Sequence, residues 1–368
     1  PELPAAVDGV IQRATAKEPE SRYPDALSLA ADFRQALDLE AALPEVPLEE
    51  IYNPYKGLRA FQEADADDFF GREALTGQLL ARLVETPSPE SGEEPALSLP
   101  KGLGGGRFLA VVGPSGSGKS SVVKAGLLPA LRKGALPGSE GWFITEMVPG
   151  ALPLEELERA LMSITSYPDL NLKEELAKKS YGLLRAAWLA LPSKETELLL
   201  VIDQFEELFI LVENEGERAH FLELLHTAVT DKDSLVRVII TLRADFYDRP
   251  LMYPDFGQLV DAHSANVLPL TADELDQAIR APAERVGAVL EKGLVTAITT
   301  DITDQPGALP LLQYALTELF ERREGRMLTG EAYQSISGVL GALGRRAEEA
   351  YNDLDQYGKD ISRQMFLR

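Results

Sequence analysis

The residues best suited to carry chemistry form a glycine-rich stretch between an apolar run and a helical pattern. They match the spacing G-x-x-x-x-G-K-[ST] and are Gly113, Pro114, Ser115, Gly116, Ser117, Gly118, Lys119 and Ser120, with Ser121 next in the chain. Such glycines let successive amide groups point at one anion, and the helix that follows adds the positive end of its dipole. We expect a site for ATP or ADP, with Lys119 at the β- and γ-phosphates and Ser120 as a ligand of Mg²⁺; an ordinary glycine turn is the alternative.

A carboxylate that could complete this site ends another apolar run. Asp203 follows the letters LLLVI, where an unpaired carboxylate is costly, so we expect it to ligate Mg²⁺. Capping of the next helix is the alternative role. Gln204 stands where many fast ATPases carry a glutamate, and a glutamine can orient water but cannot accept its proton. We expect slow ATP hydrolysis, with Glu206 or Glu207 as the base.

Two further groups have the chemistry to contact a nucleotide. Arg243 ends the run VRVIITLR, where its guanidinium could bind the γ-phosphate or could instead pair with Asp245 or Asp248. The aromatic pair Phe69 and Phe70 precedes a Gly-Arg-Glu helix start. This pair could form the wall of an adenine pocket, or it could belong to the hydrophobic core.

These groups need a sheet to bring them together, and the pattern after residue 107 predicts one. Apolar runs at 107–113, 142–148, 197–205 and 236–243 alternate with helical patterns at 119–132, 153–165, 173–191 and 206–230. Strands without polar alternation, separated by helices, indicate an α/β fold: a P-loop NTPase with a largely parallel sheet and helices on both faces. After about Thr271 only helical patterns remain, which predicts an all-α lid and no further strands.

The remaining pattern divides the chain. We expect a helical hairpin at 1–38, an acidic, proline-containing linker at 39–56, the NTPase core at 57–268 and the lid at 269–327. Residues 86–106, rich in Pro, Gly and Ser, are expected to form a mobile insertion.

Composition excludes several classes of function. The 368 residues include no cysteine, which rules out disulfides and thiolate chemistry. A net charge of −23 would repel a phosphate backbone, so we expect no nucleic acid to bind here. No run approaches the ~18 apolar residues of a membrane span, and no signal peptide is apparent. We expect a cytoplasmic protein, and the absence of an initial methionine predicts a fragment of a longer one.

Five motifs in order resemble the STAND class of signalling ATPases, and in particular the bacterial branch called novel STAND NTPases. They are NPYKGLRAFQEADADDFFGRE at 53–73, the P-loop, VIDQFEELF at 201–209, TLRADFYDRP at 241–250 and PGALPLLQYALTELF at 306–320. The resemblance implies that Phe70, Gly71 and Arg72 line the adenine side and that Arg243 senses the γ-phosphate. It also implies that Pro310 contacts the base from the lid.

The resemblance carries further expectations. Residues 328–368 are similar to the start of the family's winged-helix module. Relatives commonly carry Gly-x-Pro at the lid contact, whereas this chain has Ala308 before Leu309 and Pro310, with Gly307 one place early. The family implies a switch that is closed with ADP and open with ATP, a homo-oligomer when active, and C-terminal sensor repeats in the full-length chain.

The opening residues resemble the last two helices of a bacterial Ser/Thr protein kinase domain. In that resemblance Arg22 would be the arginine that pairs with a glutamate near the activation segment. The catalytic signatures of a kinase are absent from the sequence, so we expect no protein phosphorylation by this chain. A generic helical hairpin is the alternative.

Two other functions share some of these features. An ABC transport ATPase also carries GPSGSGKSS, but the chain has no LSGGQ-like signature between the P-loop and Asp203. A transcription regulator could bind DNA through a winged helix, but the acidic charge opposes that function.

Overall fold

The computed structural model describes residues 5–16, 22–23, 51–84, 106–165, 167, 170–193, 196–302 and 307–367. The second predicted helix of the opening hairpin and nearly all of the predicted insertion at 86–106 lie outside these residues. Of the hairpin, α1 (Ala5–Ala14) is described.

A five-stranded parallel sheet forms the centre of the larger domain, with strand order β2-β3-β4-β1-β5. Its strands are β1 (Phe108–Gly113), β2 (Phe143–Met147), β3 (Leu198–Ile202), β4 (Val236–Arg243) and β5 (Ser264–Asn266). The predicted α/β fold with a parallel sheet is therefore confirmed. The sequence did not reveal β5, since three residues are too few to show a strand pattern.

Helices cover both faces of this sheet, as predicted. In chain order the helical elements are η3 (Glu63–Asp68), α3 (Glu73–Val84), α4 (Lys119–Ser121), η4 (Val122–Leu127), α5 (Leu128–Arg132), η5 (Ser139–Gly141), α6 (Pro153–Met162), α7 (Leu172–Leu176), α8 (Gly182–Ala190), α9 (Glu207–Ile210), α10 (Glu215–Thr230), η6 (Ala244–Phe246), α11 (Asp248–Leu251) and α12 (Pro254–Ala262).

Alternate strand residues point into separate cores on the two faces. On β1, Phe108 and Ala110 pack with residues of α6, α8, α10 and α12, whereas Leu109 and Val111 pack with residues of α3, η4 and α5. Because both faces are buried, β1 and β3 are apolar throughout, which is the pattern that predicted them.

Two helices predicted as continuous are interrupted. The pattern at 173–191 divides into α7 and α8, and the pattern at 206–230 divides into α9 and α10. Asn214 begins α10, because its side chain accepts hydrogen bonds from the amides of Gly216 and Glu217. An apolar helical period continues across such a break, so periodicity alone does not locate it.

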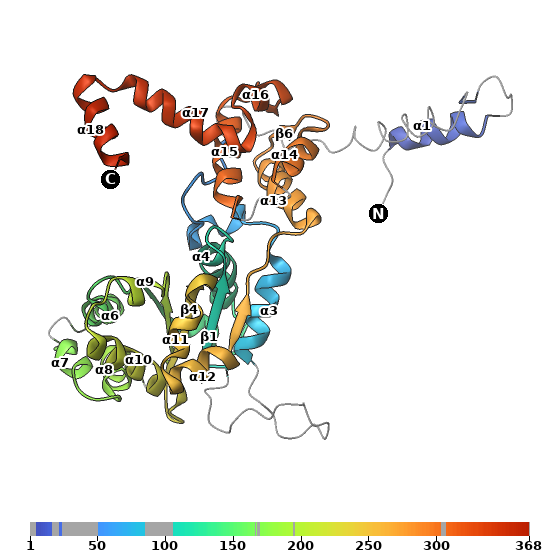
Figure 1. The fold of residues 1–368 in the computed structure, drawn as a ribbon. Helices are drawn as coiled ribbons and strands as arrows, with labels where there is room; N and C mark the ends of the chain where they lie inside the picture. The colour runs from blue at the N-terminus through green and yellow to red at the C-terminus, as the bar shows by residue number, and fades with distance from the viewer. Residues whose placement is uncertain are drawn as a thin grey trace.

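The second domain, which we call the helical lid, comprises α13 to α17 and lies beyond the ends of the sheet strands (Figure 1). Its elements are α13 (Ala272–Arg285), β6 (Val289–Leu290), α14 (Leu294–Ile302), α15 (Leu309–Glu321), β7 (Met327–Leu328), α16 (Gly330–Ser335) and α17 (Gly338–Asp353), followed by α18 (Gln356–Phe366). The prediction that strands end before Thr271 is wrong, since β6 and β7 pair in parallel. Each has only two residues.

The core of the helical lid extends past both predicted boundaries. Ile51 and Tyr55 are buried in it, although they belong to the segment predicted as a linker. Tyr333 and Val339 also belong to this core, although a separate module was predicted to start at residue 328. Within the described part of the chain, every helix is too short or too polar to cross a bilayer.

Candidate functional site

The sheet order brings the predicted site residues to one edge. The P-loop follows β1, Asp203 follows β3, and β4 lies between those two strands. Register pairs Gly113 with Arg243 at the carboxyl ends of β1 and β4. In an open parallel sheet this edge is where ligands bind.

The P-loop has the backbone of an anion cradle. Gly116 and Gly118 have φ angles of 72° and 89°, which are in the left-handed region that favours glycine. The Nζ atom of Lys119 donates hydrogen bonds to the carbonyl oxygens of Gly113 at 3.0 Å and Pro114 at 2.8 Å. Burial lowers the pKa of Lys119, while the charge of Glu206 acts in the opposite direction.

Two hydroxyl groups hold Asp203 at the end of β3. Its Oδ1 atom accepts hydrogen bonds from Ser120 Oγ at 2.7 Å and from Thr241 Oγ1 at 2.6 Å. Burial alone would raise the pKa of Asp203, but these bonds and the ammonium group of Lys124 lower it below its usual value. The carboxylate is therefore ionised and lies beside Ser120, the other residue predicted to ligate Mg²⁺.

The residues after Asp203 differ in their placement. Gln204 is exposed and has a φ angle of 54°, and its amide donates to Thr241 Oγ1 at 2.9 Å. Glu206 is buried, and its Oε2 atom accepts a hydrogen bond from the Arg243 amide at 3.3 Å. Glu207 begins α9 and is half-buried. Of the two predicted bases, Glu206 is the one hydrogen-bonded to the end of β4.

The side chain of Arg243 pairs with Asp245, one of the alternatives that the sequence left open. The Nε and Nη2 atoms of Arg243 lie 3.0 and 2.6 Å from the two carboxylate oxygens of Asp245. These hydrogen bonds raise the pKa of Arg243. The guanidinium group also lies over the ring of Phe246, 5.5 Å from its centroid. In this conformation the arginine is held by its own loop.

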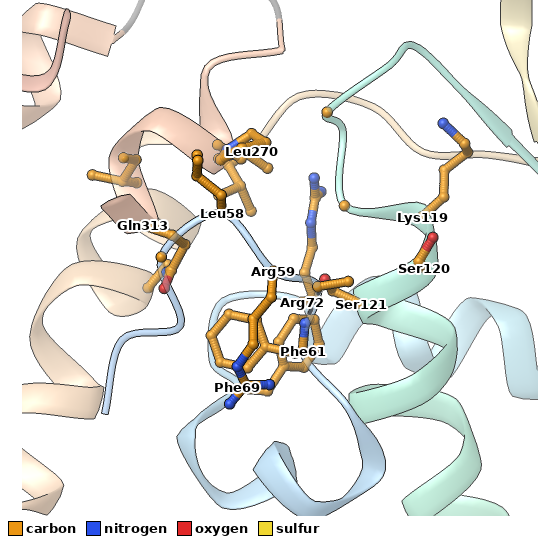
Figure 2. Close-up of a pocket in the computed structure, with 18 of the residues that line it drawn as sticks. Leu58, Arg59, Phe61, Phe69, Arg72, Lys119, Ser120, Ser121, Leu270 and Gln313 are labelled. Atoms are coloured by element: carbon orange, nitrogen blue, oxygen red, sulfur yellow. Dashed lines mark hydrogen bonds between the residues drawn. The ribbon is translucent and has the colours of Figure 1, made fainter. Parts of the chain in front are cut away.

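A cavity of about 210 Å³ lies where the sheet domain meets the helical lid (Figure 2). The sheet domain contributes Asp68, Phe69, Phe70, Arg72, Gly116, Gly118, Lys119, Ser120 and Ser121. The segment at 57–61 and the lid residues Leu270, Ala278, Leu309, Pro310, Leu312 and Gln313 complete the wall. Its volume is below the range of roughly 300–1,000 Å³ that is usual for small-molecule sites.

The predicted residues Gly113, Pro114, Ser115, Ser117, Asp203, Glu206, Glu207 and Arg243 do not line this cavity. The first four belong to the P-loop itself, and the other four follow β3 or end β4 at the same edge of the sheet. Gly71 is also absent from the wall and instead approaches the lid, because a Cβ atom there would be 2.3 Å from the carbonyl oxygen of Glu274. Its φ angle of 82° and this close contact both require glycine.

The cavity has an aromatic side and a P-loop side (Figure 2). The rings of Phe61 and Phe69 lie 5.3 Å apart on one side, and Lys119 and Ser120 lie on the other, with Arg72 between them (Figure 2). Arg72 is buried and donates a hydrogen bond to the carbonyl oxygen of Ser117 at 3.2 Å. Its guanidinium therefore faces the P-loop, although the resemblance implied the adenine side.

The helical lid touches the P-loop directly. A Cβ atom on Gly307 would lie 2.8 Å from the Ser115 carbonyl oxygen, and one on Gly116 would lie 2.6 Å from the Gly307 carbonyl oxygen. Only glycine permits this approach of two backbones. Pro310, the predicted lid contact, follows in the first turn of α15 and lines the cavity.

Sequence reasoning missed three contributors to the site. Thr241 is a polar residue in an apolar strand, a signal that could have identified it. Gln313 and Lys124 gave no such signal, because polar residues on amphipathic helices are common. The segment at 57–61 was part of a recognised motif, but its position between the two domains depends on the tertiary fold.

One protein family matches most of the chain. The family described as Novel STAND NTPase 1 matches residues 54–368. No curated protein matches the chain. Three similar solved structures are the Drosophila ORC bound to DNA (13% identity, TM-score 0.42, 77% of this chain and 77% of that chain covered), the Walker-type ATPase of Pyrococcus abyssi (17%, 0.42, 83% and 79%) and the ORC2 protein of Aeropyrum pernix with ADPNP and ADP (18%, 0.45, 84% and 74%). The family match covers the P-loop, the sheet and the helical lid, and the chain belongs to the novel STAND NTPase 1 family.

Proposed function

We propose that this chain is an ATP- and ADP-binding switch that hydrolyses ATP slowly. The observation that carries the proposal is the shared cavity, whose wall combines P-loop residues with residues of the helical lid. A ligand in this cavity contacts both domains at once. Its identity can therefore change the preferred arrangement of the two domains.

The residues present fit a magnesium nucleotide. The P-loop offers glycines with positive φ, and the buried hydroxyl of Ser117 has no hydrogen-bond partner among the described residues. Lys119 would bind the phosphates, and Ser120 and Asp203 would hold Mg²⁺, which neutralises phosphate charge when bound. Phe61 and Phe69, at the opposite side of the cavity, supply an apolar surface for a base.

Glu206 is the better candidate for the base. It is buried, it accepts the Arg243 amide, and its charge acts on Lys119 more strongly than that of Asp203. Gln204, the residue after Asp203, cannot accept a proton from water. We expect slow turnover, because Glu206, which would act as the base in place of Gln204, already accepts a hydrogen bond from the Arg243 amide.

The switch itself would act through Arg243 and the helical lid. We propose that a γ-phosphate draws Arg243 away from Asp245 and that the lid then moves off the P-loop. Changing a two-state population from 1:99 to 99:1 needs about 5.5 kcal/mol of differential binding. Several charge-assisted hydrogen bonds can supply that amount.

We further propose that the open form assembles into homo-oligomers and that, in a longer protein, sensor repeats and a Ser/Thr kinase domain are coupled to it. The support for these partners is the family and the kinase-like sequence of the opening residues. The Arg22 Nε atom donates to the Ala16 carbonyl oxygen at 2.7 Å, and a kinase glutamate would replace that contact.

The experiment is to denature the purified protein and identify any released nucleotide, then to titrate the emptied protein with Mg-ATP and Mg-ADP. We expect ADP to be released and both nucleotides to bind. Lys119→Ala should abolish binding while circular dichroism stays unchanged. A wild-type protein that is empty and does not bind either nucleotide would overturn the proposal.

A further inference from the structure

Lys124 lies beside Asp203, a predicted magnesium ligand, and the proposed function assigns it no role. It is on η4, four residues after Ser120, so the two side chains share one face of the helix that follows the P-loop. The Nζ atom of Lys124 lies 3.2 Å from Asp203 Oδ2 and 3.1 Å from Glu146 Oε2. Ser120 thus contacts one carboxylate oxygen of Asp203, and Lys124 contacts the other.

These groups are shielded from water to different degrees. The side chains of Lys124 and Asp203 are 15% and 6% exposed, whereas that of Glu146 is 35% exposed. The contact with Asp203 is therefore the less screened of the two. In this structure one ammonium group serves as the counter-ion of two carboxylates.

We propose that Lys124 is a positioning residue that acts as a permanent counter-ion of Asp203 and allows the chain to retain nucleotide without Mg²⁺. This inference rests on the proposed nucleotide site. Without a counter-ion, the Asp203 carboxylate beside the P-loop would repel phosphates when the metal is absent. Lys124 cancels that repulsion. It also reduces the contribution that Mg²⁺ bound at Asp203 makes to nucleotide affinity.

A purely structural role makes a different prediction. If Lys124 only ties the helix after the P-loop to β2 and β3, its removal lowers nucleotide affinity by the same factor with and without metal. If Lys124 is a counter-ion, its removal lowers nucleotide affinity only when metal is absent. The ratio of the two affinities therefore separates the roles.

The test is to measure ADP affinity by calorimetry in excess Mg²⁺ and in EDTA. We expect chelation to weaken binding by less than about tenfold in the wild-type protein. In Lys124→Met it should weaken binding by a further factor of about ten or more, the size expected for one partly screened charge near phosphate. Lys124→Arg, which keeps the charge, should restore the wild-type ratio.

Two controls sharpen the result. Lys133→Gln removes an exposed positive charge just after the same helix and should leave the ratio unchanged. Glu146→Gln leaves Lys124 to Asp203 alone and should not weaken binding in EDTA, which tests the inference even if Lys124→Met does not fold.

An equal ratio in Lys124→Met and wild type overturns the inference, as does weaker metal-free binding in Glu146→Gln. A wild-type protein that does not bind ADP in either buffer overturns the proposed function together with this inference.

Discussion

The close approach of Gly307 to the P-loop allows the position of the helical lid to be perturbed by one methyl group. In Gly307→Ala the new Cβ atom would lie 2.8 Å from the Ser115 carbonyl oxygen, so the lid or the P-loop must move. Gly293→Ala is a matched control, because nothing lies within 4 Å of its Cβ atom. The φ angles of the two glycines are similar, at 78° for Gly307 and 88° for Gly293.

The two variants share one cost and differ in another. Alanine in the left-handed region costs about 1–2 kcal/mol, and both variants should lose that much stability in thermal or denaturant unfolding. Overpacking adds about 1–3 kcal/mol to Gly307→Ala alone, and only in the closed arrangement. An energy of that size shifts the ratio of closed to open forms by roughly 5- to 150-fold.

The assay is the release rate of a fluorescent ADP analogue after mixing with excess ADP. Gly307→Ala should release it at least about fivefold faster than Gly293→Ala, since the closed lid is the form that retains nucleotide. Equal release rates in the two variants would refute the idea that contact between the lid and the P-loop controls retention.

Two other predictions concern charged pairs. Asp245→Ala removes the carboxylate that holds Arg243, so the ratio of ATP to ADP affinity, measured by calorimetry, should rise severalfold; an unchanged ratio would remove Arg243 from the proposed sensor role. Hydrogen bonds from Arg59 hold the pKa of Asp65 well below its usual range. At pH values above the unfolded-state pKa of about 3.9, the ionised carboxylate therefore stabilises the fold. This contribution is lost as the pH falls toward the lower folded-state pKa. Asp65→Asn should therefore cost about 1 kcal/mol of unfolding free energy at pH 7 and distinctly less at pH 3, and a pH-independent cost in urea titrations would contradict this.

The sequence was sufficient to predict four of the five strands and to bring the proposed nucleotide-binding residues to one edge of the sheet. Gly113 and Asp203 each end an apolar run, and parallel strands place such ends together. The interruption after α9 and the short strand β5 were not predictable, because neither changes the hydrophobic period over a long enough window. Local pattern therefore gave the fold class and the strands that carry the P-loop, but not every element.

Contacts between residues far apart in the sequence were the part that local pattern could not provide. The Oη atom of Tyr55 donates to the Ile279 carbonyl oxygen at 2.6 Å, which fixes part of the predicted linker in the core of the helical lid. The pairing of Lys124 with Asp203 likewise depends on how the helix after the P-loop lies over the sheet. Such contacts join residues far apart in the sequence, and no spacing rule relates them.

The central claim is that nucleotide in the shared cavity sets the arrangement of the helical lid and the sheet domain. The sequence contains no cysteine, so a single pair of spin labels can be introduced at exposed positions, at Glu223→Cys on α10 and Thr296→Cys on α14. Electron paramagnetic resonance then measures the distance between the labels with Mg-ADP and with a non-hydrolysable ATP analogue. We predict different distance distributions for the two nucleotides, and the Lys119→Ala variant should show no difference. Identical distributions in a wild-type protein that has bound both nucleotides would contradict the account.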